Sequence, residues 1–176
     1  MKLNKKLFTT LNILLIFSFF FNLSQFSYSN KGESYIDFNS QIKKKLKNVD
    51  YWNLTGAPID IDDNNPSKNW ETTVATYNWC RGTGTLQDPY IIENVTIDGQ
   101  GVGSCIKISN SNEHFIIRNC TLLHSGSAFS VDAGIYLFDV FYGVLIENTC
   151  SLNANGILLE NSEHNIISNN NTNENN

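Results

Sequence analysis

The chain has 176 residues and carries 12 lysines and arginines against 17 aspartates and glutamates, which gives a formal net charge of −5. Four of the lysines cluster between positions 43 and 47 instead of following one face of the chain. A nucleic-acid-binding surface needs a basic face, so we exclude DNA and RNA as primary ligands.

The N-terminus has the pattern of a secretory signal peptide. Three lysines fall within the first six residues, and the uncharged apolar run Leu7–Leu23 follows. Ser27 and Ser29 stand in an A-x-A-like relation, so we expect residues 1–29 to be removed by cleavage after Ser29. An uncleaved membrane anchor is the alternative, because the run is near the lower length limit for spanning a bilayer. Either form would place the chain outside the cell or on its surface.

Residues 30–84 are predicted to be an N-terminal cap. A loose helical spacing of apolar residues precedes Val49, whereas residues 51–81 contain all three tryptophans and two prolines and are typical of strands and turns. Aromatic side chains here could stack on sugars, although sealing a core is their commoner role. These aromatic residues are Trp52, Trp70, Tyr77 and Trp79.

One segment of this cap has the spacing of a calcium loop. Asp60, Asp62, Asn64 and Glu71 occupy positions 1, 3, 5 and 12 of such a loop, which are positions that supply oxygen ligands. Position 6 is an asparagine instead of the usual glycine, and no helices clearly flank the segment. Calcium at these four residues is therefore one hypothesis, an acidic turn is the other, and no other cofactor is expected.

From residue 85 to 176 the sequence repeats. The segment Cys105–Asn119 aligns with Gly134–Asn148 without a gap and with Gly156–Asn169 after one deletion. Each unit has two short apolar runs with a spacing of two, which places alternate residues on one face of a strand. The first runs pair Ile106 and Ile108 with Ile135 and Leu137 and then with Ile157 and Leu159, and the second runs pair Phe115 and Ile117 with Val144 and Ile146.

An asparagine follows each second run. Asn94, Asn119, Asn148 and Asn169 recur at intervals of 25, 29 and 21 residues, close to one coil of a parallel β-helix with loop insertions. In such a coil equivalent residues stack about 4.8 Å apart, so the four amides are predicted to form a buried ladder. The predicted fold is all-β, a right-handed parallel β-helix of about three coils with an N-terminal cap.

The segment Gly82–Gly101 (GTGTLQDPYIIENVTIDGQG), with SCIKI and IIRNCTL after it, resembles right-handed parallel β-helix repeat proteins of the NosD and CASH carbohydrate-binding type. The preceding WNLTGAPIDIDD resembles secreted β-helix proteins of Asgard archaea. The resemblance covers about residues 51–176 and indicates fold more strongly than function, since the family includes lyases, hydrolases, epimerases and binding modules. Such helices usually run for many coils, so we expect either a chain that continues beyond Asn176 or an end that pairs with another chain.

The repeats show no convincing catalytic site. Acids of consecutive units do not converge, and Arg118 is predicted to pair with Glu147 at the surface. His114 and His164 fall at nearly the same turn two coils apart, too far apart to share one copper ion. We therefore predict no catalytic residue and interpret the histidines as solvated.

The four cysteines are expected to be structural, because an exported chain can keep disulfides. A Cys80–Cys105 bond would join cap to helix, and Cys120 and Cys150 are expected to be a stacked pair or a second bond. Among the glycosylation sequons, the one at Asn53 is the best acceptor, since Asn94 and Asn119 are expected to be buried.

These features together favour a secreted or cell-surface β-helix module that acts as a binding or structural element, with carbohydrate as the ligand class and end-to-end self-association as a further expectation. Two alternatives stay open: the N-terminal part of a polysaccharide lyase or glycoside hydrolase, and a NosD-like accessory to copper-site maturation. Any membrane contact would be made through the uncleaved signal segment.

Overall fold

The computed structural model describes residues 51–126 and 131–176, which form an all-β structure with parallel sheets and one short helix. The predicted signal peptide at residues 1–29 and the predicted helical stretch before Val49 lie outside the described residues. Within the described part of the chain, no helix is long and apolar enough to cross a membrane.

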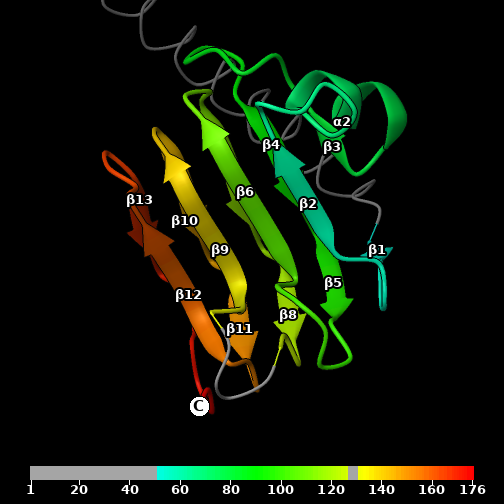
Figure 1. Cartoon of the computed structure of the whole chain (residues 1–176), viewed down its shortest axis with the longest axis vertical. Helices are drawn as coiled ribbons and strands as arrows, with labels where there is room; N and C mark the ends of the chain where they lie inside the picture. The colour runs from blue at the N-terminus through cyan, green and yellow to red at the C-terminus, as the bar shows by residue number, and fades with distance from the viewer. Residues whose placement is uncertain (1–50, 127–130) are drawn as a thin grey trace, which may run out of the picture. The chain divides into compact units, whose positions relative to one another are not determined.

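Three sheets contain the strands (Figure 1). The first sheet has the order β1 (Trp52–Asn53), β5 (Val95–Asp98), β8 (Thr121–Leu123) and β11 (Thr149–Ser151). The second has the order β2 (Ile59–Asp62), β6 (Ile106–Ser111), β9 (Ala133–Val140) and β12 (Asn155–Glu160). The third has the order β3 (Cys80–Arg81), β4 (Tyr90–Glu93), β7 (Phe115–Arg118), β10 (Gly143–Ile146) and β13 (Ile166–Ser168). All neighbours are parallel except β3 and β4, which are antiparallel.

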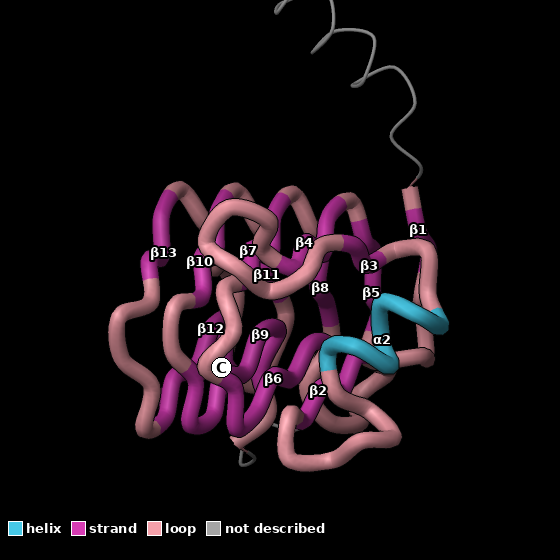
Figure 2. Tube along the Cα trace, turned by 90° about the horizontal axis from the view of Figure 1, so that it is seen from above, coloured by secondary structure: helices cyan, strands magenta, loops and turns pink. Residues whose placement is uncertain are grey.

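From β4 onward the chain visits the three sheets in rotation, so each strand pairs with the strand three places later (Figure 2). We refer to one passage through β6, β7 and β8 as the second coil, to β9, β10 and β11 as the third coil, and to residues 155–176, with β12 and β13, as the last coil. β1 and β2 already pair in parallel with β5 and β6, so the stacked strands begin inside the predicted cap.

The core is made of the inward side chains of these strands. The first apolar runs pair as predicted, with Ile106 opposite Ile135 and Ile135 opposite Ile157. The prediction for the second run is wrong by one residue, because Phe115 lies opposite Gly143 and Ile117 lies opposite Leu145. The interval between equivalent residues falls from 29 in β6 and β9 to 28 in β7 and β10. A shift of one residue moves every side chain to the other face of a strand, so Leu145 is buried while Val144 and Ile146 face outward.

The predicted asparagine ladder is also corrected. Asn94, Asn119 and Asn169 fall at one repeated turn, but Glu147 occupies that place in the third coil instead of Asn148. All four residues at this place have positive φ between 51° and 57°. Asparagine tolerates this left-handed conformation better than most residues, so the turn explains the recurrence. Asn119 does donate to the side chain of Asn94, but it is exposed, and the predicted four-residue stack does not form.

A different set of asparagines joins the coils. Asn148 accepts a hydrogen bond from the backbone N–H of Cys120 and donates one to the carbonyl of Ile117, so its side chain bridges a turn of the preceding coil. Four others do the same, with distances of 2.7 to 3.0 Å, and they are Asn153, Asn165, Asn170 and Asn175. Each bridged turn has a left-handed residue just before the bonded N–H, at Asn119, His124, Tyr142, Glu147 and Leu152. Each bridge gives the backbone N–H that follows a turn a side-chain acceptor from the next coil.

Helix α2 (Trp70–Thr76) lies between β2 and β3, in a segment for which the sequence predicted strands and turns. Asn69 caps its start by accepting from the backbone N–H of Thr72. Trp70 is buried, stacks on Tyr90 with ring centroids 4.8 Å apart, and donates from its indole to Ser111. A helix this short is marginal in isolation, so these tertiary contacts of Trp70 stabilise it.

Candidate functional site

A cavity of about 540 Å³ lies between β1, β2 and α2. Its walls are aromatic and aliphatic, from Trp52, Tyr77, Trp79 and the edge strands, and its polar groups are Asp60, Ser67, Lys68, Asn78 and three threonines. Tyr77 and Trp79 stack with ring centroids 5.0 Å apart, and Tyr77 is 48% exposed. A concave apolar site with a few polar groups is the usual form of a small-ligand site.

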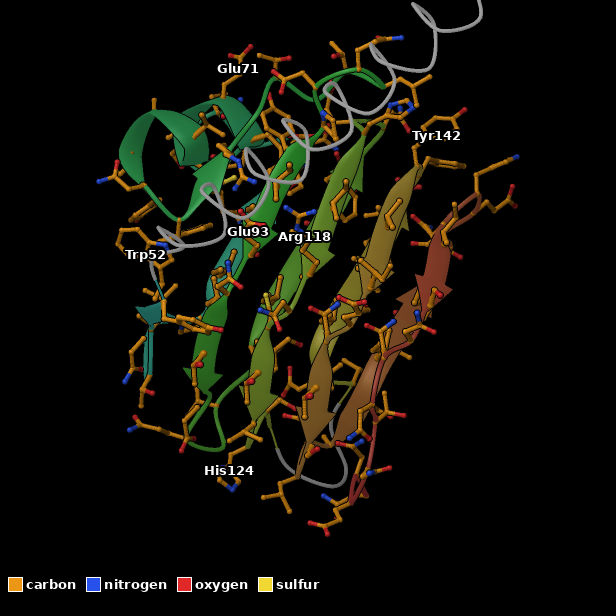
Figure 3. The ribbon with its side chains drawn as sticks, turned by 180° about the vertical axis from the view of Figure 1, so that it is seen from behind. Trp52, Glu71, Glu93, Arg118, His124 and Tyr142 are labelled. Atoms are coloured by element: carbon orange, nitrogen blue, oxygen red, sulfur yellow. The ribbon has the colours of Figure 1, made fainter. Side chains whose placement is uncertain are left out.

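The four aromatic residues singled out in the sequence thus divide into two roles. Trp70 and Trp79 are buried in the core, as core-sealing residues should be. Trp52 is half-buried at the edge of the first sheet (Figure 3). Tyr77 is exposed. Trp52 and Tyr77 therefore present ring surface to a ligand in the cavity.

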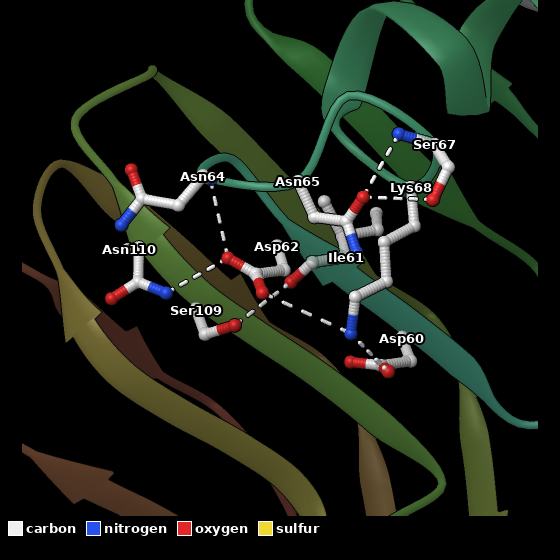
Figure 4. Close-up of polar contacts among 9 residues, drawn as sticks. All are labelled: Asp60, Ile61, Asp62, Asn64, Asn65, Ser67, Lys68, Ser109 and Asn110. Atoms are coloured by element: carbon white, nitrogen blue, oxygen red, sulfur yellow. Dashed lines mark hydrogen bonds and ion pairs between the residues drawn. The ribbon is translucent and has the colours of Figure 1, made fainter.

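A charged pair forms the rim of the cavity. The Lys68 ammonium lies 2.7 Å from the carboxylate of Asp60 and 3.9 Å from that of Asp62 (Figure 4). Hydrogen bonding to Asp60 is the main cause that raises the pKa of Lys68. Both members of the pair are partly exposed, so the pair adds little stability and its groups remain available to a ligand.

The acidic side chains of the candidate calcium loop bond to groups of the protein itself. Asp62 accepts hydrogen bonds from the side chain of Asn110 and from the backbone N–H of Asn64, and the Asn110 bond is the main cause that lowers its pKa. Glu71 lies on α2, and the cation beside Asp60 and Asp62 is Lys68. Among residues 51–126 and 131–176, no group of three or more histidine, cysteine or acidic side chains could hold a metal ion.

From the rim, polar and aromatic side chains continue across the outward face of the second sheet. Asp60 lies opposite Lys107, and Lys107 lies opposite Tyr136 with its ammonium 5.6 Å from the ring centroid. The Tyr136 hydroxyl donates to Glu160 on β12. Burial, followed by the hydrogen bond to Glu160, raises the pKa of Tyr136 to about 12. This row places aromatic surface beside hydrogen-bonding groups on consecutive strands.

A second charged cluster lies on the outward face of the third sheet. Glu93 accepts from both Arg81 and Arg118. Arg118 therefore pairs with Glu93 on the preceding strand (Figure 3) and not with Glu147 as predicted. Burial by itself would raise the pKa of Glu93, but the hydrogen bonds and charges of the two arginines outweigh it and lower the pKa. The three charged side chains pair with one another, so we interpret the cluster as stabilising the fold.

The histidines take positions that the sequence did not indicate. His114 stacks on Tyr142 with ring centroids 4.9 Å apart, and Tyr142 lies 5.8 Å from His164, so a tyrosine ring lies beside both histidines. His124 lies 3.1 Å from Asp98. Neither arrangement places a histidine against a cysteine or serine nucleophile.

All four cysteines are free and buried, so the predicted Cys80–Cys105 disulfide is not formed. Cys80 belongs to β3 of the third sheet, whereas Cys105 directly precedes β6 of the second sheet. Cys120 and Cys150 do not stack either, because Cys150 lies opposite Leu122. Burial raises the pKa of the Cys120 thiol to about 12 and that of Cys105 to about 11, so these thiols stay protonated near neutral pH.

The side chain of Asn53 is exposed and accepts from both the backbone N–H and the hydroxyl of Thr55. Its glycosylation stays a prediction.

Comparison with protein-family models, with curated proteins and with solved structures finds no match.

The sequence pointed to Asp60 and to the aromatic residues of the cavity, but for separate reasons. Asp60 was a candidate metal ligand, and the aromatic residues were weighed as sugar-stacking groups. The structure brings them together because β1, β2 and α2 border one cavity. Tyr136 was not singled out as a site residue, and no local motif marks it, since Lys107 and Glu160 belong to other strands.

Proposed function

We propose that the chain is an exported right-handed parallel β-helix module that binds carbohydrate at the cavity between β1, β2 and α2. The rotation of the chain through three parallel sheets supports the β-helix, and parallel crossovers are right-handed in about 98% of cases, which supports its hand. The signal pattern at residues 1–29 and the resemblance to NosD and CASH proteins support export and the ligand class.

The observation that carries the carbohydrate proposal is the pairing of aromatic walls with a charged rim. Trp52 and Tyr77 offer ring surface on which the apolar face of a sugar can pack. Asp60 and Lys68 offer an acceptor and a donor for sugar hydroxyls at the same opening. The row through Lys107 and Tyr136 continues from this rim, so an extended glycan fits better than a single sugar.

Affinity electrophoresis in gels containing soluble β-glucan, xylan or polygalacturonate tests this proposal. We expect retardation by at least one of the three polysaccharides, and we expect Tyr77→Ala to weaken it by about two- to tenfold, because an aromatic contact contributes roughly 0.5–1.5 kcal/mol. Tyr142→Ala is the matched control, since Tyr142 is 45% exposed and Tyr77 is 48% exposed, and Tyr142 does not line the cavity.

Equal losses for the two variants would show that retardation does not arise at the cavity. No retardation by any of the three polysaccharides would remove the support for carbohydrate as the ligand class. Circular dichroism of both variants establishes that each is folded before its binding is compared.

A further inference from the structure

Four asparagines stand two residues before a threonine in an N-x-T sequon, and the structure separates them by exposure. Asn53 and Asn119 are exposed. Asn94 is 6% exposed, and Asn170 is half-buried. The sequence predicted that Asn119 would be buried in a ladder, and that prediction is wrong. Since a modified sequon lies at the surface, the structure adds Asn119 to Asn53 as a glycan acceptor.

Asn119 lies at the turn between β7 and β8, with a left-handed φ of 51°. Its side-chain amide donates to the side-chain oxygen of Asn94. An asparagine amide nitrogen carries two hydrogens, so substitution of one leaves the other to donate. A glycan at Asn119 therefore leaves room for this hydrogen bond and enters solvent instead of the core.

The other two amides are held inside the structure. Asn170 donates to the carbonyl of Leu145 and accepts from the backbone N–H and the side chain of Asn148. A sugar on the Asn170 amide would compete with this bridge between coils. Asn94 accepts from Asn119 and is nearly enclosed, so it has no open path for a sugar.

Asn53 and Asn119 both border the outward face of the first sheet. Asn53 lies opposite Thr96, and Thr96 lies opposite Thr121, which is the threonine of the Asn119 sequon. These two threonines alternate with buried residues along their strands, so they face outward. Asp60, at the rim of the proposed binding cavity, belongs to the second sheet. Glycans at Asn53 and Asn119 would therefore cover a different sheet from the one that continues the cavity rim.

We propose that Asn119, unlike Asn94 and Asn170, is an acceptor for an N-linked glycan supplied by a polyprenyl diphosphate oligosaccharide. The Nδ2 atom of Asn119 forms a bond to C1 of the first sugar as the bond between C1 and the diphosphate oxygen breaks. The lipid diphosphate leaves with the electron pair, and a base of the transferase takes the displaced amide proton. The proposal rests on the proposed export, because N-x-T sequons are modified in secreted chains.

Transfer to the folded full chain in vitro tests this site without requiring export. The chain is incubated with a purified single-subunit oligosaccharyltransferase and a polyprenyl diphosphate oligosaccharide, and mass spectrometry of glycopeptides measures the occupancy of each sequon. We expect the occupancy of Asn119 to be similar to that of Asn53. The occupancy of Asn94 and Asn170 should be lower by at least about tenfold, because these side chains must first leave buried or bridging positions.

Two controls separate the effect of the fold from that of the local sequence. Four short peptides, each with one of the sequons, should all be modified, so that differences in the folded chain arise from burial. Thr121→Val removes the hydroxyl that the sequon requires and should abolish modification of Asn119 without changing that of Asn53. Thr149→Val removes the threonine opposite Thr121, which belongs to no N-x-T sequon, and should change neither site. Both variants should keep the circular dichroism spectrum of the original chain.

An unmodified Asn119 in a folded chain that is modified at Asn53 would overturn the proposal. Equal occupancy of all four sequons would also overturn it, because exposure would then not select the acceptor. The same holds if the Asn119 peptide is not modified, or if no sequon of the folded chain is. None of these results measures export or retardation by a polysaccharide, so a failure of this site is distinguishable from a failure of the proposed function.

Discussion

The third coil and the last coil follow the same chain path and differ in what covers them. Leu145 in β10 and Ile167 in β13 pair directly, yet Leu145 is fully buried and Ile167 is 49% exposed. Asn148 is 1% exposed, whereas its partner Asn170 is only partly buried. The inward side chains of a coil are therefore fully buried only when another coil packs on each side, and each coil covers the side chains of the coil before it.

The largest expected difference between the two coils concerns the core. Leu145→Ala removes a fully buried side chain and should reduce the free energy of unfolding by about 2–5 kcal/mol. Ile167→Ala, at the same position of the last coil, should reduce it by less than about 1 kcal/mol, because water already reaches that side chain. Urea denaturation of the two variants measures both values, and equal losses would contradict the view that, of these two coils, only the third is enclosed.

The bridging asparagines should give the next largest effect. Asn148→Leu removes both hydrogen bonds of the bridge and leaves the N–H of Cys120 without its side-chain acceptor, so we expect a loss of about 1–3 kcal/mol. Asn169→Gly is the control, since Asn169 is exposed with φ of 55° and glycine adopts that conformation freely. Thermal unfolding of both variants distinguishes the bridge from the predicted ladder. The ladder would give Asn148 and Asn169 the same role, so it predicts similar losses of stability for the two variants.

A hydrogen bond across the two coils can be followed by its pH dependence. Tyr136 in the third coil donates to Glu160 in the last coil, and its pKa is raised from 10.0 to about 12. Because the folded-state pKa exceeds the unfolded value, the stabilisation is complete below pH 10 and is lost as the pH rises toward 12. Glu160→Gln removes a charge that opposes ionisation, so an ultraviolet titration should show the phenol ionising closer to pH 10; an unchanged titration would mean that burial alone sets the pKa.

The smallest expected effect concerns the turns. Leu152 and Glu174 occupy the same turn of the third and last coils, with φ of 59° and 54°. Leu152→Gly relieves this unfavourable conformation and should increase the free energy of unfolding by roughly 0.5–1 kcal/mol. Glu174→Gly should add less, because the last coil has only one neighbour. Chemical denaturation would contradict this if Leu152→Gly proved destabilising.

The pairing predicted from the sequence is correct for the first apolar run and wrong for the second, and both outcomes have one explanation. In the first run Lys107 separates Ile106 from Ile108, so only one face can be apolar. In the second run Val144, Leu145 and Ile146 are consecutive and all apolar, so alternation does not say which of them face inward. Pairing with Ile117 across the sheet decides in favour of Leu145.

For the candidate site too, spacing along the chain indicated some of the residues, and only the structure shows their neighbours. Spacing along the chain marked Asp60 and Asp62 as oxygen ligands, but it could not show that Lys68 would lie beside them or that Asn110, from another strand, would bind Asp62. The bridging asparagines could have been noticed from the five-residue spacing of Asn165, Asn170 and Asn175. Residues 153–176 contain so many asparagines that this spacing was not informative until the bridged turns were known.

The sequence by itself determined that this chain would form short parallel-stacking strands, because period-two apolar pairs recur at a near-constant interval and asparagines stand where the backbone must turn. Only the tertiary structure decided which residue of each apolar run is buried, which asparagines bridge, and which aromatic groups border the cavity. The physical reason is that each of these choices depends on a hydrogen bond or a packed side chain supplied by a neighbouring coil, about 4.8 Å away in space but more than twenty residues away along the chain.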